Sequence, residues 1–307
     1  MKFVCLSDIH LSSDNPEARL DNLVDTQMKK FEFVLKFAKD HDADILQAGD
    51  VFHRPRSWML LPMVIDLLKK YKVRFFCVRG QHDDYMYSDE TKDRTNLGIL
   101  SKIGLVTPLG KEPIKISDDV CIYGANFGDN LPVAKKGSYN IGVIHTSISD
   151  EALWPGHNFT PASKFLKSNN SYDFILVGDI HRFFKVNAFD GRILINAGPM
   201  LRRESTQYNF THDPSLYLLD TKKHEIERVM IPHDPADKIL SRDHIERQQE
   251  TEGMLDEFIN SIKSGVDTNT CVSFIENLLI FSKENNVEPN VMQVLANFME
   301  RTRRNTL

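Results

Sequence analysis

Five short segments of the chain place carboxylate, imidazole and amide side chains directly after apolar runs. The segments are residues 7–10 (SDIH), 49–53 (GDVFH), 80–83 (GQHD), 144–146 (IHT) and 178–181 (GDIH). Open α/β sheets place their sites in loops just past the carboxyl ends of buried strands, so side chains distant in sequence can converge there. The pattern predicts one metal site, assembled from Asp8, His10, Asp50, His145, Asp179 and His181, with Gln81 as a further member.

The types of side chain indicate which metals this site would hold. Imidazole and carboxylate without thiolate suit manganese, iron or zinc in a catalytic site and disfavour a structural zinc. Asp8 and His10 are separated by one residue, as are Asp179 and His181. At a strand end this spacing turns both side chains of a pair to one face. Metals held in such a site can activate a bound water molecule as a nucleophile.

Each segment alone also has an ordinary structural explanation. A single D-x-H arises often by chance, a Gly-Asp pair after a strand is commonly a turn, and Asp83 could cap a helix. His145 by itself could be a hydrogen-bonded core histidine. All the segments together, each after an apolar run, are much better explained by one metal site than by separate coincidences.

The elements that must position these residues alternate between strands and helices. Apolar runs at residues 2–7, 44–48 and 73–78 predict strands, and residues 23–41 and 58–71 carry apolar positions at helical spacing. Further strands are expected at residues 120–123, 139–144, 174–177, 192–196, 216–220 and 226–231. The alternation predicts an α/β fold of two packed β-sheets with helices on their outer faces.

The chain changes character after Pro232 and Pro235, where helices are expected over residues 243–263, 269–285 and 290–303. We therefore expect a main domain over residues 1–235 and a small C-terminal helical region over residues 236–307. The last helix carries an apolar stripe of Val291, Leu295, Phe298 and Met299. Such a stripe packs either against a partner or against its own domain.

The composition excludes several classes of protein. The 307-residue chain is 41% hydrophobic and 26% charged, as in ordinary globular proteins. It shows neither a long apolar span nor a signal-peptide pattern, so we expect no membrane segment. Its 4 scattered cysteines fit free thiols in a reducing cytoplasm. The net charge of −5 disfavours a protein that coats nucleic acid by bulk electrostatics, but it does not exclude a nuclease.

The ordered set D-x-H, G-D-x-x-H, G-[NQ]-H-D, a lone His and G-x-x-H resembles the motifs of the calcineurin-like metallophosphoesterase superfamily. His53 in GDVFH and the stretch GRILINAGPMLRR at residues 191–203 resemble its SbcD-like DNA repair and recombination nuclease branch, of phage or bacterial type. The resemblance covers residues 1–232. It implies the four-layer metallophosphoesterase fold and two-metal-dependent hydrolysis of DNA phosphodiesters, as an exonuclease or endonuclease.

By position, the resemblance also implies a role for each motif residue. Asp8, His10 and His181 would hold the first metal, and Asp50 would bridge both metals. Gln81, His145 and Asp179 would hold the second metal. His82 would be a catalytic acid over the scissile phosphate, oriented by Asp83, and His53 would help to place the substrate strand. Arg202 and Arg203 close a turn expected beside the site, where they would bind substrate phosphates.

Gln81 and Asp179 depart from the family pattern, which usually has Asn and His there. Glutamine offers the same amide oxygen on a chain that is longer by one methylene. Aspartate adds negative charge, which favours harder metals. We therefore expect two divalent ions, with Mn²⁺ ahead of Mg²⁺, Fe²⁺ or Zn²⁺.

The resemblance further implies DNA as substrate, a homodimer, and an SbcC-like, SMC-type ATPase as partner. Two other functions stay open on the sequence. The first is a small-molecule phosphatase or cyclic-nucleotide phosphodiesterase on the same metal core. The second is a catalytically degenerate scaffold.

Overall fold

The computed structural model describes residues 1–87, 89–243, 280–285, 287–288 and 291–292. The chain divides into two compact units, Met1–His244 and Ile245–Leu307. The helices expected over residues 243–263, 269–285 and 290–303, and their apolar stripe, lie almost entirely outside the described residues. Within the described part of the chain, no helix combines the length and apolar character needed to cross a membrane.

Six strands form the first sheet, and four adjacent strands within it, β1 to β4, are parallel. In order across the sheet they are β14 (Glu225–Met230), β13 (Ser215–Asp220), β1 (Lys2–Leu6), β2 (Ala43–Ala48), β3 (Phe75–Val78) and β4 (Thr107–Pro108). β2 pairs in parallel with both β1 and β3, so the carboxyl ends of these strands lie at one edge. After the strands of the second sheet, the chain returns to the first sheet as β13, which pairs antiparallel with β1.

The second sheet also has six strands and a parallel centre. Its order is β11 (Phe184–Asn187), β12 (Ile193–Asn196), β10 (Phe174–Gly178), β7 (Tyr139–His145), β6 (Val120–Ala125) and β5 (Ile114–Ser117). β12, β10, β7 and β6 are parallel to one another, and β11 and β5 pair antiparallel at the two edges. A small separate ladder joins β8 (Ile148–Ser149) to β9 (Thr160–Pro161).

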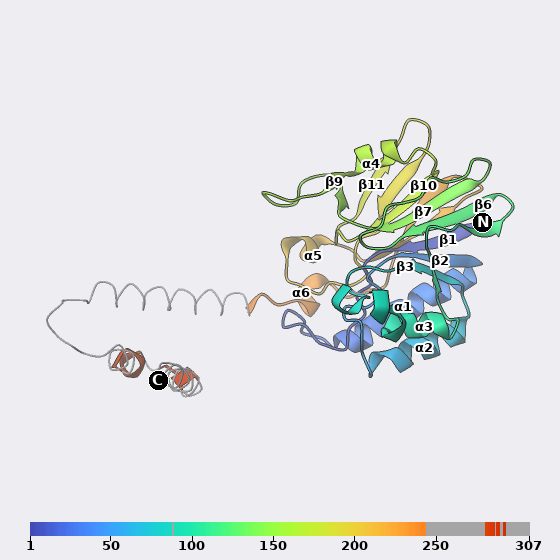
Figure 1. Ribbon diagram of the computed structural model, residues 1–307. Helices are drawn as coiled ribbons and strands as arrows, with labels where there is room; N and C mark the ends of the chain where they lie inside the picture. Colours follow the sequence, from blue (N-terminus) through green and yellow to red (C-terminus); the bar gives the residue numbers. More distant parts are fainter. Residues whose placement is uncertain (88, 244–279, 286, 289–290, 293–307) are drawn as a thin grey trace. The chain divides into compact units, whose positions relative to one another are not determined.

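Helices cover the outer faces of both sheets (Figure 1). α1 (Leu23–Asp40), α2 (Leu60–Tyr71) and α3 (Asn96–Lys102) pack on the first sheet, and α4 (Ala162–Ser168) packs on the second. The shorter elements are η1 (Tyr85–Tyr87), η2 (Asp89–Arg94), α5 (Gln207–Thr211) and α6 (Ala236–Ile239). The prediction of two packed sheets flanked by helices is confirmed.

Strand β1 shows why its sequence is apolar throughout. Phe3 and Cys5 point into the core between the two sheets, whereas Val4 and Leu6 point into the core beneath the helices. A parallel strand covered on both faces carries continuous apolar residues rather than an alternating pattern. The buried ends of such strands fix the loops that follow them, and these loops hold the candidate site.

Candidate metal centre

All five motif segments meet at one edge of the two sheets. Three of them follow β1, β2 and β3 of the first sheet, and two follow or end β7 and β10 of the second. Gly178 pairs in register with His145, which brings the two segments of the second sheet side by side. Four candidate ligands have left-handed backbone conformations: Asp8 (φ 49°), His10 (φ 49°), Asp50 (φ 53°) and Asp179 (φ 93°). Such strained conformations cluster at functional sites.

The first candidate set consists of Asp8, His10 and His181, whose ligand atoms all lie within 4.8 Å of one another. His10 Nε2 is 2.9 Å from His181 Nε2, and His181 Nε2 is 3.8 Å from Asp8 Oδ1. Two ring nitrogens that face each other need a proton or a cation between their lone pairs. Asp8 Oδ2 is buried and has no hydrogen-bond partner among the described residues.

The second candidate set consists of Gln81, His145 and Asp179. His145 Nδ1 donates to the Ala48 carbonyl oxygen at 2.7 Å, which directs the Nε2 lone pair into the site. Gln81 Nε2 donates to Asp179 Oδ1 at 2.8 Å, and this leaves Gln81 Oε1 at 2.7 Å from His145 Nε2. In the neutral ring two lone pairs would face each other here, so this contact needs either a proton on His145 Nε2 or a cation.

Asp50 lies between the two sets. Its Oδ2 is 3.6 Å from His10 Nε2 and 3.4 Å from His145 Nε2, and Oδ2 has no hydrogen-bond partner among the described residues. Its Oδ1 accepts the backbone N–H of His82 at 2.9 Å. This central position is the one expected of a carboxylate that bridges two cations.

Burial and neighbouring charges shift the pKa values of two ligands in directions that fit a site lacking positive charge. Burial raises the pKa of Asp8 well above its usual range. Burial also acts to lower the pKa of His145, but the Asp50 carboxylate 3.4 Å away overcomes this and raises that pKa to about 10. Buried oxygens without partners, facing lone pairs and a mixed oxygen and nitrogen donor set fit a pair of divalent cations.

Two glycines of the motifs are required by close approach. A Cβ atom on Gly178 would collide with the Ala48 carbonyl oxygen and lie 2.8 Å from His145 Nδ1. A Cβ atom on Gly80 would collide with the Asp50 carboxylate. Both glycines therefore allow the loops of the two sheets to close around the ligands.

We expect Gly178→Ala to destabilise the protein by about 1–3 kcal/mol, because the added methyl overpacks the junction between the sheets. It should also weaken metal binding about 10- to 100-fold, because it displaces the acceptor that orients His145. Denaturant unfolding and metal titration measure the two effects. Gly110→Ala is the matched control, since nothing lies within 4 Å of its added Cβ. Equal behaviour of the two variants would contradict this account.

Asn196 is a positioning residue that the sequence patterns did not reveal. It is fully buried, its Nδ2 donates to the Ile180 carbonyl at 2.7 Å, and its Oδ1 accepts from Ser7 Oγ at 2.9 Å. It thereby ties the loop of Asp8 to the loop of Asp179. The one available signal was a polar residue that ends a buried apolar strand.

His82 and His53 lie beside the metal ligands. Their rings stack with centroids 5.2 Å apart, and His82 Nδ1 donates to the His53 backbone carbonyl at 3.0 Å. The expectation that Asp83 orients the His82 ring is therefore wrong. The Asp83 carboxylate instead accepts the backbone N–H groups of Val51, Phe52 and Gly80. A buried carboxylate is stabilised by several such donors, so Asp83 anchors the two loops to each other.

Arg202 and Arg203 differ sharply despite being neighbours. Arg202 is 2% exposed and donates to the carbonyls of His212 and Asp234, both at 2.8 Å. The expectation that it binds substrate is wrong, because its guanidinium is used inside the fold. Arg203 is half-buried and donates to the His10 carbonyl at 3.4 Å, so it stays close to the metal ligands.

The two arginines should respond differently to truncation. We expect Arg202→Ala to lower the free energy of unfolding by about 3 kcal/mol, since it leaves buried acceptors without donors. Arg203→Ala should lower it by less than about 1 kcal/mol and raise KM for a phosphodiester about tenfold, the effect of losing one charged contact. Denaturant unfolding and steady-state kinetics on both variants measure this. If only Arg202→Ala raised KM, substrate binding would have to be assigned to Arg202 rather than to Arg203.

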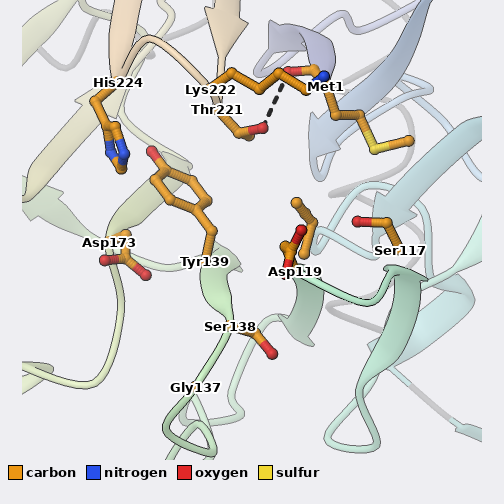
Figure 2. A pocket seen from close by; sticks show the side chains of 11 residues that line it. Met1, Ser117, Asp119, Gly137, Ser138, Tyr139, Asp173, Thr221, Lys222 and His224 are labelled. Atoms are coloured by element: carbon orange, nitrogen blue, oxygen red, sulfur yellow. Dashed lines mark hydrogen bonds between the residues drawn. The ribbon is translucent and has the colours of Figure 1, made fainter.

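A surface cavity lies at the amino ends of the parallel strands, opposite the metal centre (Figure 2). Its lining includes Met1, Tyr139 and Asp173, which lie at or just before the starts of β1, β7 and β10. The candidate ligands follow the carboxyl ends of the strands, and none of them lines this cavity. The cavity is therefore separate from the metal centre.

Residues 1–211 match the family described as calcineurin-like phosphoesterases. No curated protein matches the chain. Among solved structures, a dimetal phosphatase from Danio rerio gives a TM-score of 0.50 at 12% identity, over 71% of this chain and 91% of that one. The TT1561 protein of Thermus thermophilus gives 0.47 at 12% identity, over 75% and 99%. Vps29 of Entamoeba histolytica, complexed with Zn²⁺, gives 0.37 at 13% identity, over 76% and 100%.

The dimetal phosphatase supports the fold alone at this identity. The family match is decisive, because it covers more than half of the chain and includes every candidate ligand from Asp8 to His181. The chain therefore belongs to the calcineurin-like phosphoesterase family and is a metal-dependent phosphoesterase.

Proposed function

We propose that this phosphoesterase is a DNA nuclease of the SbcD-like branch that works with Mn²⁺. The two divalent cations would be held by the seven residues of the metal centre, with Asp50 between them. When bound, they supply positive charge to the phosphate and lower the pKa of the attacking water. His82, Arg203 and His53 are the groups of this chain that would bind and orient the ester beside them.

The observation that carries the proposal is the position of His53. Its ring stacks on His82, and its centroid is 5.6 Å from that of His10, so it borders the metal ligands directly. Burial and then the positive charge of Arg203 lower the pKa of His53 to about 4. A neutral His53 and a cationic Arg203 therefore share one side of the centre. That side suits the charged backbone of a nucleic acid strand.

The loop that follows His53 offers further groups for a polymer. Arg54 has a 70% exposed side chain that pairs with the exposed Asp14 at 3.1 Å, and Trp58 is 91% exposed. Arg56 lies over the ring of Tyr85, 4.8 Å from its centroid. Cationic and aromatic side chains side by side are how proteins hold single strands without sequence preference. These cationic and aromatic groups lie together beside one loop, so they could bind a nucleic acid strand there although the whole chain has a net charge of −5.

Hydrolysis of matched substrates tests the proposal. The purified protein with Mn²⁺ would be given end-labelled single- and double-stranded DNA, a phosphodiester reporter and a phosphomonoester reporter. We expect cleavage of DNA and of the diester, with little hydrolysis of the monoester. The Trp58→Ala variant should lose activity on DNA but keep it on the small diester. Rapid monoester hydrolysis without DNA cleavage would refute the nuclease.

A small-molecule phosphatase or cyclic-nucleotide phosphodiesterase is the second candidate. The acidic net charge of −5 favours it, because most of the surface gives no bulk attraction to DNA. The same substrate panel, extended with a cyclic nucleotide, separates this function from the first.

We also propose that the protein acts as a homodimer and with an SMC-type ATPase, docked through the unit Ile245–Leu307. The proposal is supported by position, since every candidate ligand belongs to the other unit. Deleting residues 245–307 should keep hydrolysis of the diester reporter and abolish stimulation by such an ATPase. Light scattering measures the oligomeric state. A truncated protein that loses the reporter activity would contradict this division of labour.

A further inference from the structure

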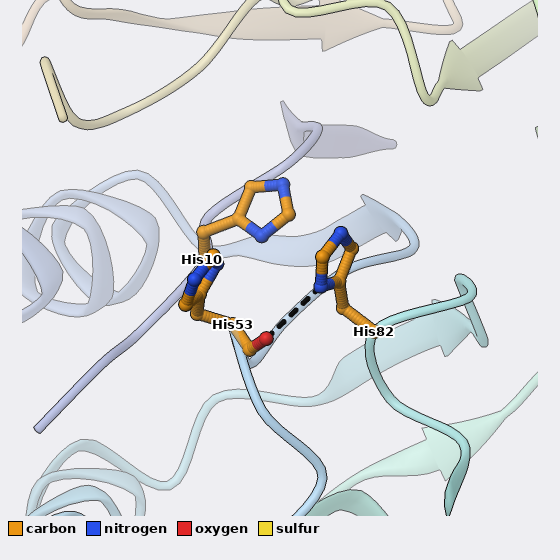
Figure 3. A group of neighbouring side chains, drawn as sticks. All are labelled: His10, His53 and His82. Carbon is orange, nitrogen blue, oxygen red and sulfur yellow. Dashed lines mark hydrogen bonds between the residues drawn. The ribbon is translucent and has the colours of Figure 1, made fainter. Parts of the chain in front are cut away.

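Three imidazoles from different loops face one another beside the metal centre (Figure 3). They belong to His10, His53 and His82, and one ring nitrogen from each lies within 4.8 Å of the others. The His10 centroid is 5.6 Å from that of His53 and 4.9 Å from that of His82. We call this group the three-histidine cluster. It shares His10 with the metal centre but contains no carboxylate.

The hydrogen bonds of the cluster leave nitrogen atoms free to bind something. His10 is 3% exposed, and its Nδ1 is buried without a hydrogen-bond partner among the described residues. His53 Nδ1 is likewise buried and without a partner among them. His82 Nδ1 donates to the His53 carbonyl, so in the neutral ring the lone pair sits on Nε2.

His10 is unusual for a metal ligand. A histidine that binds a metal through one nitrogen nearly always donates the other N–H to an oxygen, which fixes the ring. His10 offers Nε2 to the metal centre, 3.6 Å from Asp50 Oδ2, yet no described residue accepts from its Nδ1. No hydrogen bond to a described residue therefore holds the proton on Nδ1, the tautomer in which Nε2 can bind a metal.

We propose that the three-histidine cluster is a second, inhibitory site for Zn²⁺ or a similar transition metal, and that it overlaps the metal centre at His10. Three imidazoles are a sufficient protein ligand set for zinc, with water in the fourth position. Mn²⁺ binds nitrogen ligands most weakly among the divalent first-row metals, so it would not compete well there.

The inhibition follows from the lone pairs of His10. A neutral imidazole has one lone pair, so His10 serves either the metal centre through Nε2 or the cluster through Nδ1. Zinc in the cluster withdraws His10 from the first metal position. It also occupies His53 and His82, which the proposed function assigns to the substrate. Zinc would thus act as an inhibitor even while Mn²⁺ activates.

Zinc inhibition at saturating Mn²⁺ tests the site, with each rate divided by the rate of that variant without zinc. We expect His53→Ala to raise the zinc concentration for half-inhibition by at least about tenfold, because loss of even an outer-shell partner costs that much. His224→Ala, in the cavity of Figure 2, is the matched control and should behave like the unmodified protein. Inhibition of His53→Ala at an unchanged zinc concentration would overturn the proposal and show that zinc replaces Mn²⁺ in the metal centre.

Direct binding gives a readout independent of activity. In the full-length Asp8→Asn, Asp50→Asn protein the metal centre lacks two carboxylates, whereas the three-histidine cluster is intact. Calorimetric titration with Zn²⁺ should still detect one tight equivalent. Adding His53→Ala, or separately His53→Asn in case alanine perturbs folding, should weaken it at least about tenfold. Zinc affinity unaffected by both changes would refute the cluster as a site.

Discussion

Asp50→Asn should reduce metal-dependent phosphoester hydrolysis by about a thousandfold or more. Asp50 Oδ2 lies near both His10 Nε2 and His145 Nε2, so this carboxylate is placed to join the two metal positions. Cations at a phosphate contribute several kcal/mol of charge stabilisation in the transition state, and about 4 kcal/mol corresponds to a thousandfold in rate. Asparagine keeps the volume and can still accept the His82 N–H, so packing is preserved.

The Asp50→Asn variant is checked by metal content and turnover, with Asp44→Asn as its control. Asp44 lies near the start of the same strand β2, at the opposite edge of the sheet, where it pairs with Arg74 at 2.6 Å. We expect Asp44→Asn to keep both metals and full turnover. An Asp50→Asn protein with normal turnover would exclude Asp50 as a bridging ligand.

The fold and the convergence of the ligands were predictable because each motif combines an apolar run, which predicts a buried strand, with the polar residues that follow it. The apolar run of β2 marks a buried strand, and Gly49 and Asp50 directly follow it. Parallel strands bring such ends to one edge, whatever the distance along the chain. All seven predicted ligands therefore meet in the structure, although their roles toward metals stay predictions.

The direction of individual side chains was not predictable. Arg202 and Arg203 are adjacent and chemically identical, yet one points into the fold and the other stays near His10. The choice depends on the carbonyls of His212 and Asp234, which tertiary folding brings from other elements. Asp83 was mistaken for a partner of His82 for the same reason, because its backbone donors come mainly from the neighbouring loop.

Short and exposed elements also escaped prediction. β5 (Ile114–Ser117) is an edge strand of four residues that alternates between exposed and half-buried positions, so no continuous apolar run announces it. α3 and α4 have seven residues each, too few for a helical period to stand out. Asn196 was missed because an asparagine at a strand end resembles an ordinary turn residue.

His82→Ala should keep both Mn²⁺ ions and lose turnover by about 100- to 10,000-fold, the range expected when a general acid is removed. The His82 ring is fixed by the bond from its Nδ1 to the His53 carbonyl and is not one of the seven ligands. Its backbone N–H, which holds Asp50 Oδ1 at 2.9 Å, remains in the variant. The metal positions should therefore survive the loss of the ring.

Two measurements separate the role of His82 in catalysis from a role in metal binding. Equilibrium dialysis with Mn²⁺ should give the same stoichiometry for His82→Ala, His224→Ala and the unmodified protein. Turnover should fall only in His82→Ala, and the fall should be smaller on a diester whose leaving group needs no proton, because general acid catalysis then contributes little. An equal fall on both kinds of diester, or loss of Mn²⁺, would show that the ring supports the metal centre rather than donating a proton.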